Sequence, residues 1–370
     1  MKVLSLHFKA LDYGGLSGEK KAFSFLYSIY KLFIVFLLFW YTLSHLIRYV
    51  TSGNTDEEAK NGLFISAPYI AICMKILNYV VCAKEVINLR EKFNEKIGQP
   101  VSEGECNIFQ AYNQESNLLF WRILIFTMMC GTSVLIAPVM NKSLRDYELP
   151  LVTYQPYPIS NWAFYYFTYG WQVVGSYYGI LIQVTSDTMM YGFISLICAE
   201  YDILCARLME IGKENEIVLI KSLIDHHVFI QNLTHKTNSF FMRTVALVFC
   251  CSLLTLSGSI FNAIQFSIIS IDFLSMIAYC SCMLLQIFLY TLYGNKLIEK
   301  SQSVADAVYK SNWLNVDSAQ RRELKFIMQI CSKGTVMSYK GQCILNLNTF
   351  VWILKASYTA LNLLRSGANA

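Results

Sequence analysis

The stretch TVALVFCCSLLTLSGSIFNAIQFSIISIDFLSMIAYCSCMLLQIFLYTLY, residues 244–293, decides the fold. A membrane-spanning helix needs about 20 mainly apolar residues, so this block is too long to be a single span. The apolar run is interrupted at Ser270-Ile271-Asp272. We therefore predict two spans, 244–269 and 273–293, joined by a tight turn at these residues.

Five other apolar segments are long enough to cross a membrane: 24–46, 63–83, 117–138, 163–197 and 343–365. The segment at 163–197 is longer than a bilayer requires, and we expect it to extend into the cytosol. Hydrophobic residues make up 55% of the chain and charged residues 15%, which is too apolar for a soluble domain. The sequence predicts an all-α polytopic membrane protein with seven transmembrane helices.

The positions of Lys and Arg predict the orientation of these helices. With a cytosolic N-terminus, 21 of the 30 Lys and Arg residues fall in cytosolic segments and five in outer segments. Loops retained in the cytoplasm collect positive charge, so we place the N-terminus in the cytosol and the C-terminus outside. A G-protein-coupled receptor has the opposite orientation. A metabotropic seven-helix chemoreceptor and a small-molecule transporter nevertheless stay as alternatives, although the internal repeats typical of transporters are missing.

The sequence lacks a pattern typical of catalysis, metal binding or nucleic-acid binding. None of the 12 cysteines falls in a predicted outer loop, and we interpret them as small apolar packing residues. His226, His227 and His235 do not have the spacing of metal ligands on one helix face, and we interpret them as polar positions on a cytosolic helix. We predict no enzyme, no cofactor, no metal and no nucleic-acid partner. Asn141, in an Asn-Lys-Ser triplet of a predicted outer loop, is a glycosylation candidate.

The segment between the sixth and seventh spans, 294–340, predicts a helix below the membrane. Its apolar residues recur at helical spacing: Leu324, Ile327, Met328 and Cys331. Asp317 or Ser318 can cap this helix. We expect a cytosolic helical anchor layer, which packs against the fourth and fifth spans or a neighbouring subunit. The alternative is an amphipathic helix lying on the bilayer. The expected division is a six-helix transmembrane domain at 1–293, an anchor region at 294–340 and a final helix at 341–370.

The outer halves of four spans carry aromatic, aliphatic and Met side chains with a few hydroxyl groups, a lining that suits a small apolar ligand. The candidate ligand-binding residues are Tyr69, Ile72, Cys73, Met129, Thr132, Ser133, Ile136, Tyr177, Tyr178, Met276, Tyr279 and Cys280. Ordinary helix packing and an interfacial aromatic belt are the alternative explanations.

Two ionisable residues within predicted spans raise a functional question. Lys75 is in the second span and Asp187 in the fourth. A charge in this position is a functional hypothesis by default. Lys75 is expected either to pair with an acidic residue on a neighbouring helix or to extend toward the outer face.

The last span has a polar stripe. On a regular helix the following residues fall within about 80° of arc: Asn348, Trp352, Lys355, Thr359, Asn362 and Ser366. The opposite side carries Phe350, Leu354, Leu361 and Leu364. Such a stripe favours either an oligomeric ion channel lined by several copies of this helix, or contact with polar groups of the chain's own helices. Lys355 disfavours a narrow cation pore, unless it points off the axis.

The last fifth of the chain carries two patterns that resemble those of insect odorant receptors. They are Gly294…Ser301…Ala305…Ala307-x-Tyr309…Trp313 and Gly341…Phe350…Leu354-Lys355-x-Ser357-Tyr358-Thr359. The region around His226 and His227 is similar to a His-containing stretch of the same family. The chain departs from many members in having no Pro near 334–339. Its length resembles that of the odorant-specific tuning subunits, because the shared co-receptor is longer.

The resemblance implies a fold, a function and partners. The chain would form a heterotetrameric, odorant-gated, non-selective cation channel with the co-receptor, in the plasma membrane of a sensory neuron. Its partners would then be the co-receptor, a small volatile organic ligand, membrane lipid and permeating cations. Helices two, three, four and six would form the pocket and the seventh helices would line the pore. Pore and gate candidates are then Asn348, Trp352, Thr359, Leu361, Leu363, Asn362, Leu364 and Ser366.

Overall fold

The structure is a computed structural model that describes residues 3–16, 24–51, 57–140, 149–151, 153–158, 161–212, 220–263 and 270–368. The glycosylation candidate Asn141 lies outside these residues. The helices are α1 (Ser5–Tyr13), α2 (Ser24–Thr51), α3 (Glu57–Val81), α4 (Ala83–Lys92), α5 (Glu103–Met140), α6 (Trp162–Leu208), α7 (Ile220–Ala263), α8 (Ile271–Lys310), α9 (Ser318–Cys331) and α10 (Leu347–Ala368). The shorter elements are the 3-10 turns Lys96–Gly98 and Trp313–Asn315, and the strands β1 (Ser338–Tyr339) and β2 (Cys343–Ile344).

The predicted spans correspond to seven helices: α2, α3, α5, α6, α7, α8 and α10. Five of the described helices, α2, α5, α6, α7 and α8, are long and apolar enough to cross a membrane, and α3 has a shorter apolar part, Ser66–Val81. α8 begins at Ile271, where Ser270 accepts a hydrogen bond from the Phe273 amide over 3.1 Å. This start confirms the break predicted within the apolar block, and the all-α polytopic fold is confirmed with it.

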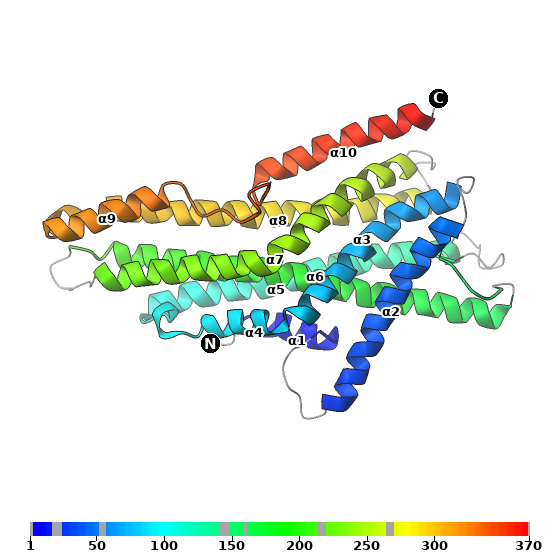
Figure 1. Cartoon of the computed structure of the whole chain (residues 1–370), viewed down its shortest axis with the longest axis horizontal. Helices are drawn as coiled ribbons and strands as arrows, with labels where there is room; N and C mark the ends of the chain where they lie inside the picture. Colours follow the sequence, from blue (N-terminus) through cyan, green and yellow to red (C-terminus); the bar gives the residue numbers. More distant parts are fainter. Residues whose placement is uncertain are drawn as a thin grey trace.

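α6 is the central helix of the bundle. Most of the apolar part of α6 is buried inside the protein, because α5, α7 and α8 pack against it. It runs without a break from Trp162 to Leu208, as expected for a span that extends into the cytosol. In Figure 1, α5, α6, α7 and α8 run together along the long axis, while α2 crosses them obliquely. The C-terminal helix α10 lies at one edge of the bundle, in contact with α7 and α8.

The cytosolic layer is built on an extension of a membrane helix. α8 continues past the expected boundary at 293/294 to Lys310, and α9 packs alongside this extension (Figure 1). The predicted apolar face of α9 is buried at Leu324, Ile327 and Cys331. Asp317 caps the helix by accepting a hydrogen bond from the Gln320 amide over 2.8 Å. The anchor helix is thus confirmed. It packs on α8, the sixth span, and not mainly on the fourth and fifth spans as expected, although Cys331 Sγ lies 3.5 Å from His227 Nε2 of α7.

Two pairs of side chains join the cytosolic ends of α5, α6 and α7: the partly exposed pair Arg207–Glu105 and the buried pair His226–Glu200. Arg207 donates two hydrogen bonds of 2.8 Å to Glu105, and His226 Nε2 lies 2.9 Å from Glu200. Burial acts to raise the pKa of Glu105, but the hydrogen bonds from Arg207 and the backbone, together with the positive charge of Arg207, outweigh burial and lower the pKa. His226 and His227, interpreted as polar positions on a cytosolic helix, are buried in the first turns of α7, where Glu200 of α6 supplies a hydrogen-bonding partner for His226.

A short hairpin connects α9 to α10. Strand β1 pairs with β2, and the turn has positive φ at Lys340 (50°) and Gly341 (73°). Two consecutive positive φ angles define the turn type whose twist matches a hairpin, and glycine adopts them without strain. The chain makes this junction by a hairpin.

Candidate functional site

A cavity of about 320 Å³ lies in the outer half of the bundle, enclosed by α3, α5, α6 and α8. Its wall is mainly aliphatic, aromatic and sulfur-containing, with Pro150 and Leu151 of the loop before α6 at its edge. A cavity of this size and lining is suited to a small, mostly apolar molecule.

Four of the candidate ligand-binding residues line this cavity. Tyr69 and Ile72 come from α3, and Met276 and Tyr279 from α8. The two helices contribute from their outer halves, as expected.

The four candidates on α5 line a different surface. Met129, Thr132, Ser133 and Ile136 border an open groove between α5 and α8, where Met129 is 68% exposed. The face of α5 that lines the cavity is formed instead by Thr127, Cys130, Gly131 and Val134. Because α5 is apolar around its whole circumference, its sequence does not indicate which face is turned inward.

The remaining candidates lie in contacts between helices. Cys73 is buried against α2, with its Sγ 3.2 Å from the Thr42 hydroxyl. The Tyr177 hydroxyl lies 2.8 Å from that of Thr132, and the Tyr178 hydroxyl 3.2 Å from that of Tyr30. Cys280 is also buried and does not line the cavity.

On α6 the sequence analysis selects Tyr177 and Tyr178, and the residues of α6 that line the cavity are others. Ser176, Ile180, Gln183, Val184 and Asp187 line the cavity from this helix. Gln183 and Asp187 are one helical turn apart, and α8 adds Gln286. Polar side chains at such positions in apolar helices are the signal that could have identified this wall.

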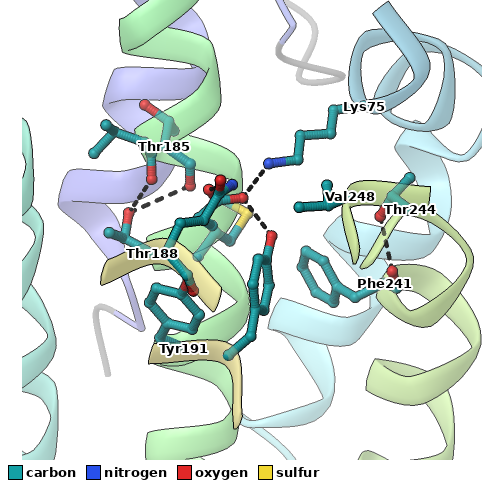
Figure 2. Close-up of polar contacts among 12 residues, drawn as sticks. Lys75, Thr185, Thr188, Tyr191, Phe241, Thr244 and Val248 are labelled. Carbon is teal, nitrogen blue, oxygen red and sulfur yellow. Dashed lines mark hydrogen bonds and ion pairs between the residues drawn. The ribbon is translucent and has the colours of Figure 1, made fainter. Parts of the chain in front are cut away.

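The Lys75 ammonium and the Asp187 carboxylate form an ion pair at the inner end of the cavity. Lys75 extends from α3 toward α6 (Figure 2), and the two side chains are 1% and 6% exposed. Asp187 also accepts a 2.6 Å hydrogen bond from Gln286 Nε2 and another from the Tyr290 hydroxyl. Of the two expectations for Lys75, pairing with a neighbouring helix is the one observed. The network joins α3, α6 and α8 and satisfies both buried charges.

The final helix is attached to the bundle along one side. Ile353, Ser357 and Leu361 are buried where α10 contacts α7 and α8, and Phe350 packs edge-on against Phe288 of α8, with 5.5 Å between ring centres. The described residues of the polar stripe are all exposed in the single subunit: Asn348, Trp352, Lys355, Thr359 and Asn362. The stripe therefore faces away from the chain's own helices.

The leucines of α10 differ in position. Leu361 is buried and Leu363 is 68% exposed. Leu354, expected on the packing side, is 37% exposed at its edge. The side chains of Leu364 and Ser366 lie outside the described residues.

Seven membrane helices, a mainly apolar cavity in their outer half and an exposed polar stripe on the last helix are typical of one class of protein: a multi-pass membrane receptor for small molecules. The model of the family described as 7tm odorant receptor matches residues 55–358. The chain belongs to this odorant receptor family.

Individual relatives agree with this assignment. Odorant receptor 94a of Drosophila melanogaster is 24% identical over 321 residues, which cover 85% of this chain and 82% of that protein. The odorant receptor coreceptor of Aedes aegypti is 25% identical over 140 residues, which cover 38% of this chain and 29% of that protein. The olfactory receptor OR5 of Machilis hrabei, solved in complex with eugenol, has the same fold, with a TM-score of 0.87 at 14% identity over 99% of this chain and 98% of that one.

Proposed function

We propose that this chain is the odorant-specific subunit of a ligand-gated, non-selective cation channel, which it forms with the co-receptor in the plasma membrane of a sensory neuron. The cavity between α3, α5, α6 and α8 is the odorant site, and the exposed face of α10 is this subunit's share of the pore wall. The observation that carries the proposal is that α8 both lines the cavity and contacts α10. The complex of Machilis hrabei OR5 with eugenol supports a small-molecule ligand.

The path from the cavity to α10 is short. Leu285, Gln286 and Leu289 of α8 line the cavity, while Phe288 in the same turn packs against Phe350 of α10. An odorant that fits the cavity better in one position of α8 favours that position, since a ligand shifts an equilibrium by its difference in affinity between the two states. When α8 moves, α10 moves with it. The leucines at the outer end of α10 then no longer close the pore by forming a hydrophobic constriction that excludes water.

The proposal predicts an odorant-evoked current that requires two subunits. Cells expressing this chain together with a co-receptor are expected to conduct cations when an odorant panel is applied, whereas cells expressing this chain alone conduct little. Surface labelling of an extracellular C-terminal tag on intact cells checks expression and orientation. Absence of any evoked current in cells with labelled surface receptor would contradict the proposal.

The pore assignment of α10 is tested by cysteine accessibility. In Asn362→Cys, a cationic thiol reagent added from outside is expected to lower the odorant-evoked current severalfold, because residue 362 is exposed on the polar stripe. The matched control is Ile353→Cys, whose side chain is fully buried on the packing side and should not react. The unsubstituted chain reports the background from native thiols. Equal effects of the reagent on the two variants would rule out the assigned orientation of α10.

A further inference from the structure

The open groove between α5 and α8 runs along the outside of the bundle. It reaches from Met140 and Ile271, at the outer ends of the two helices, to Leu124, roughly four helical turns deeper in the membrane. Its wall is mainly aliphatic and Met side chains, and Met129 and Leu274 are exposed. Little of the apolar part of α5 is buried within the subunit, so in a bilayer the groove opens toward the lipid acyl chains.

The groove and the cavity share a wall. Ser275 of α8 lines both spaces. On α5, Gly131 lines the cavity and Ser133, two positions further along, lines the groove. The Ser275 hydroxyl donates to the Ser133 carbonyl over 3.3 Å. At this point the two spaces are therefore separated by small side chains and a single hydrogen bond between α5 and α8.

The same two helices are held together at their cytosolic ends. The Lys296 ammonium of α8 lies 3.5 Å from the Glu115 carboxylate of α5 and 4.8 Å from the centre of the Tyr112 ring. A separation of the outer ends of α5 and α8 leaves these contacts in place. The helix pair can therefore part at Ser275 without coming apart along its whole length.

The outer edge of the cavity is closed more firmly, by the loop before α6. The Leu151 amide donates to Gln172 Oε1 over 3.3 Å, and Gln172 Nε2 donates to the Leu151 carbonyl over 2.9 Å. The same Nε2 donates to the Thr153 hydroxyl over 2.9 Å. The Tyr154 amide donates to the Ser44 carbonyl of α2 over 2.9 Å. Lifting this loop breaks these four hydrogen bonds, whereas parting α5 from α8 at Ser275 breaks one.

Resting on the proposed odorant site, we propose that apolar odorants enter the cavity sideways from the bilayer, along the groove between α5 and α8 and past Ser275. Apolar molecules accumulate in the hydrocarbon layer, because each CH₂ group raises their concentration there roughly fourfold relative to water. The groove offers them an apolar path from the acyl chains to the shared wall. The loop before α6 stays closed while they enter.

Narrowing the groove tests the route. With rapid solution exchange on cells expressing this chain and a co-receptor, Ser133→Phe is expected to slow both the onset and the washout of the current severalfold. The two rates should fall by the same factor and leave the half-maximal concentration unchanged, since an obstacle on the route raises the barrier equally in both directions. Ser133→Val adds less bulk and should slow both rates less, which keeps the test available if Phe prevents surface expression.

The matched control is Val139→Phe. Val139 is exposed on α5 and lines neither the groove nor the cavity, so this variant should keep the native rates. Gln172→Leu tests the rival route, because it releases three of the hydrogen bonds that hold the loop. Its onset rate should equal that of the native chain. Faster onset in Gln172→Leu, together with native rates in Ser133→Phe, would show entry from water and overturn the proposal.

Photolabelling separates this inference from the channel proposal. A diazirine analogue of 1-octanol, added to the purified chain in lipid vesicles, is expected to label cavity residues more slowly in Ser133→Phe than in Val139→Phe. That result without any current in cells would support the entry route and overturn the channel function. Equal labelling rates in the two variants, with currents of native onset in both, would overturn the entry route and leave the channel function standing.

Discussion

Replacing Lys75 with Met is expected to remove most of the folded receptor from the cell surface. The substitution leaves the Asp187 carboxylate in the membrane interior without its cation, and breaking a buried ion pair in this way costs about 3–5 kcal/mol. This is a large part of the stability of an ordinary domain, which is about 5–15 kcal/mol. Surface labelling and the melting temperature of detergent-solubilised protein measure the loss.

A second substitution is expected to restore much of the stability and surface expression that K75M loses. In the double variant K75M/D187N the buried charge is gone, and the Asn oxygen still accepts from the Tyr290 hydroxyl. Lys92→Met is the matched control, since Lys92 pairs with Glu95 over 3.2 Å at the cytosolic surface, where ion pairs contribute about 0–1 kcal/mol. If K75M were as stable as the Lys92 variant, the buried pair Lys75–Asp187 would have no structural role.

Replacing Gly294 with Ala is expected to abolish most of the odorant-evoked current while the bundle still folds. A Cβ atom at this position would lie 2.3 Å from the Leu345 carbonyl oxygen and 2.5 Å from the Leu345 Cβ. The first of these atoms is backbone, so a side-chain rotation cannot relieve the clash. Overpacking of this kind costs about 1–3 kcal/mol, and it acts two residues before the start of α10. We therefore expect α10 to shift relative to α8.

The measurement is current divided by the amount of labelled receptor at the surface. Gly170→Ala is the control, because a Cβ atom there meets no other atom within 4 Å. A normal current per receptor in the Gly294 variant would mean that the close contact between α8 and the α9–α10 connection does not position the pore helix.

The sequence predicted where the membrane helices lie because length and hydropathy are properties of each segment alone. The break before α8 and the cap of α9 at Asp317 are of this kind. The rotation of a helix depends on its neighbours, so the sequence does not predict it where a helix is apolar all round. On α5, the candidate ligand-binding residue Met129 borders the open groove, whereas Gly131, only two positions further along the chain, lines the cavity.

Polar residues inside apolar helices carried more information than the apolar ones. Lys75 and Asp187 were recognised separately, and their pairing followed from the structure. Gln183 has the same character, but a single uncharged side chain in a long helix has no evident partner in the sequence. On α10 the spacing of the polar residues was sufficient to predict one polar face, because the described stripe residues share one exposed face.

The position of α8 also bears on how such receptors diversify. Among the described residues, the cavity is lined by α3, α5, α6 and α8, while α10 packs on α7 and α8. Most substitutions that reshape the cavity therefore leave the surroundings of α10, the proposed pore helix, unchanged. Under the proposed function, selection can alter which compounds are detected without altering conduction through the pore. A family of such receptors can then detect new compounds while its members keep the same conducting function. Inherited changes along α8 are the exception, since they alter detection and output together.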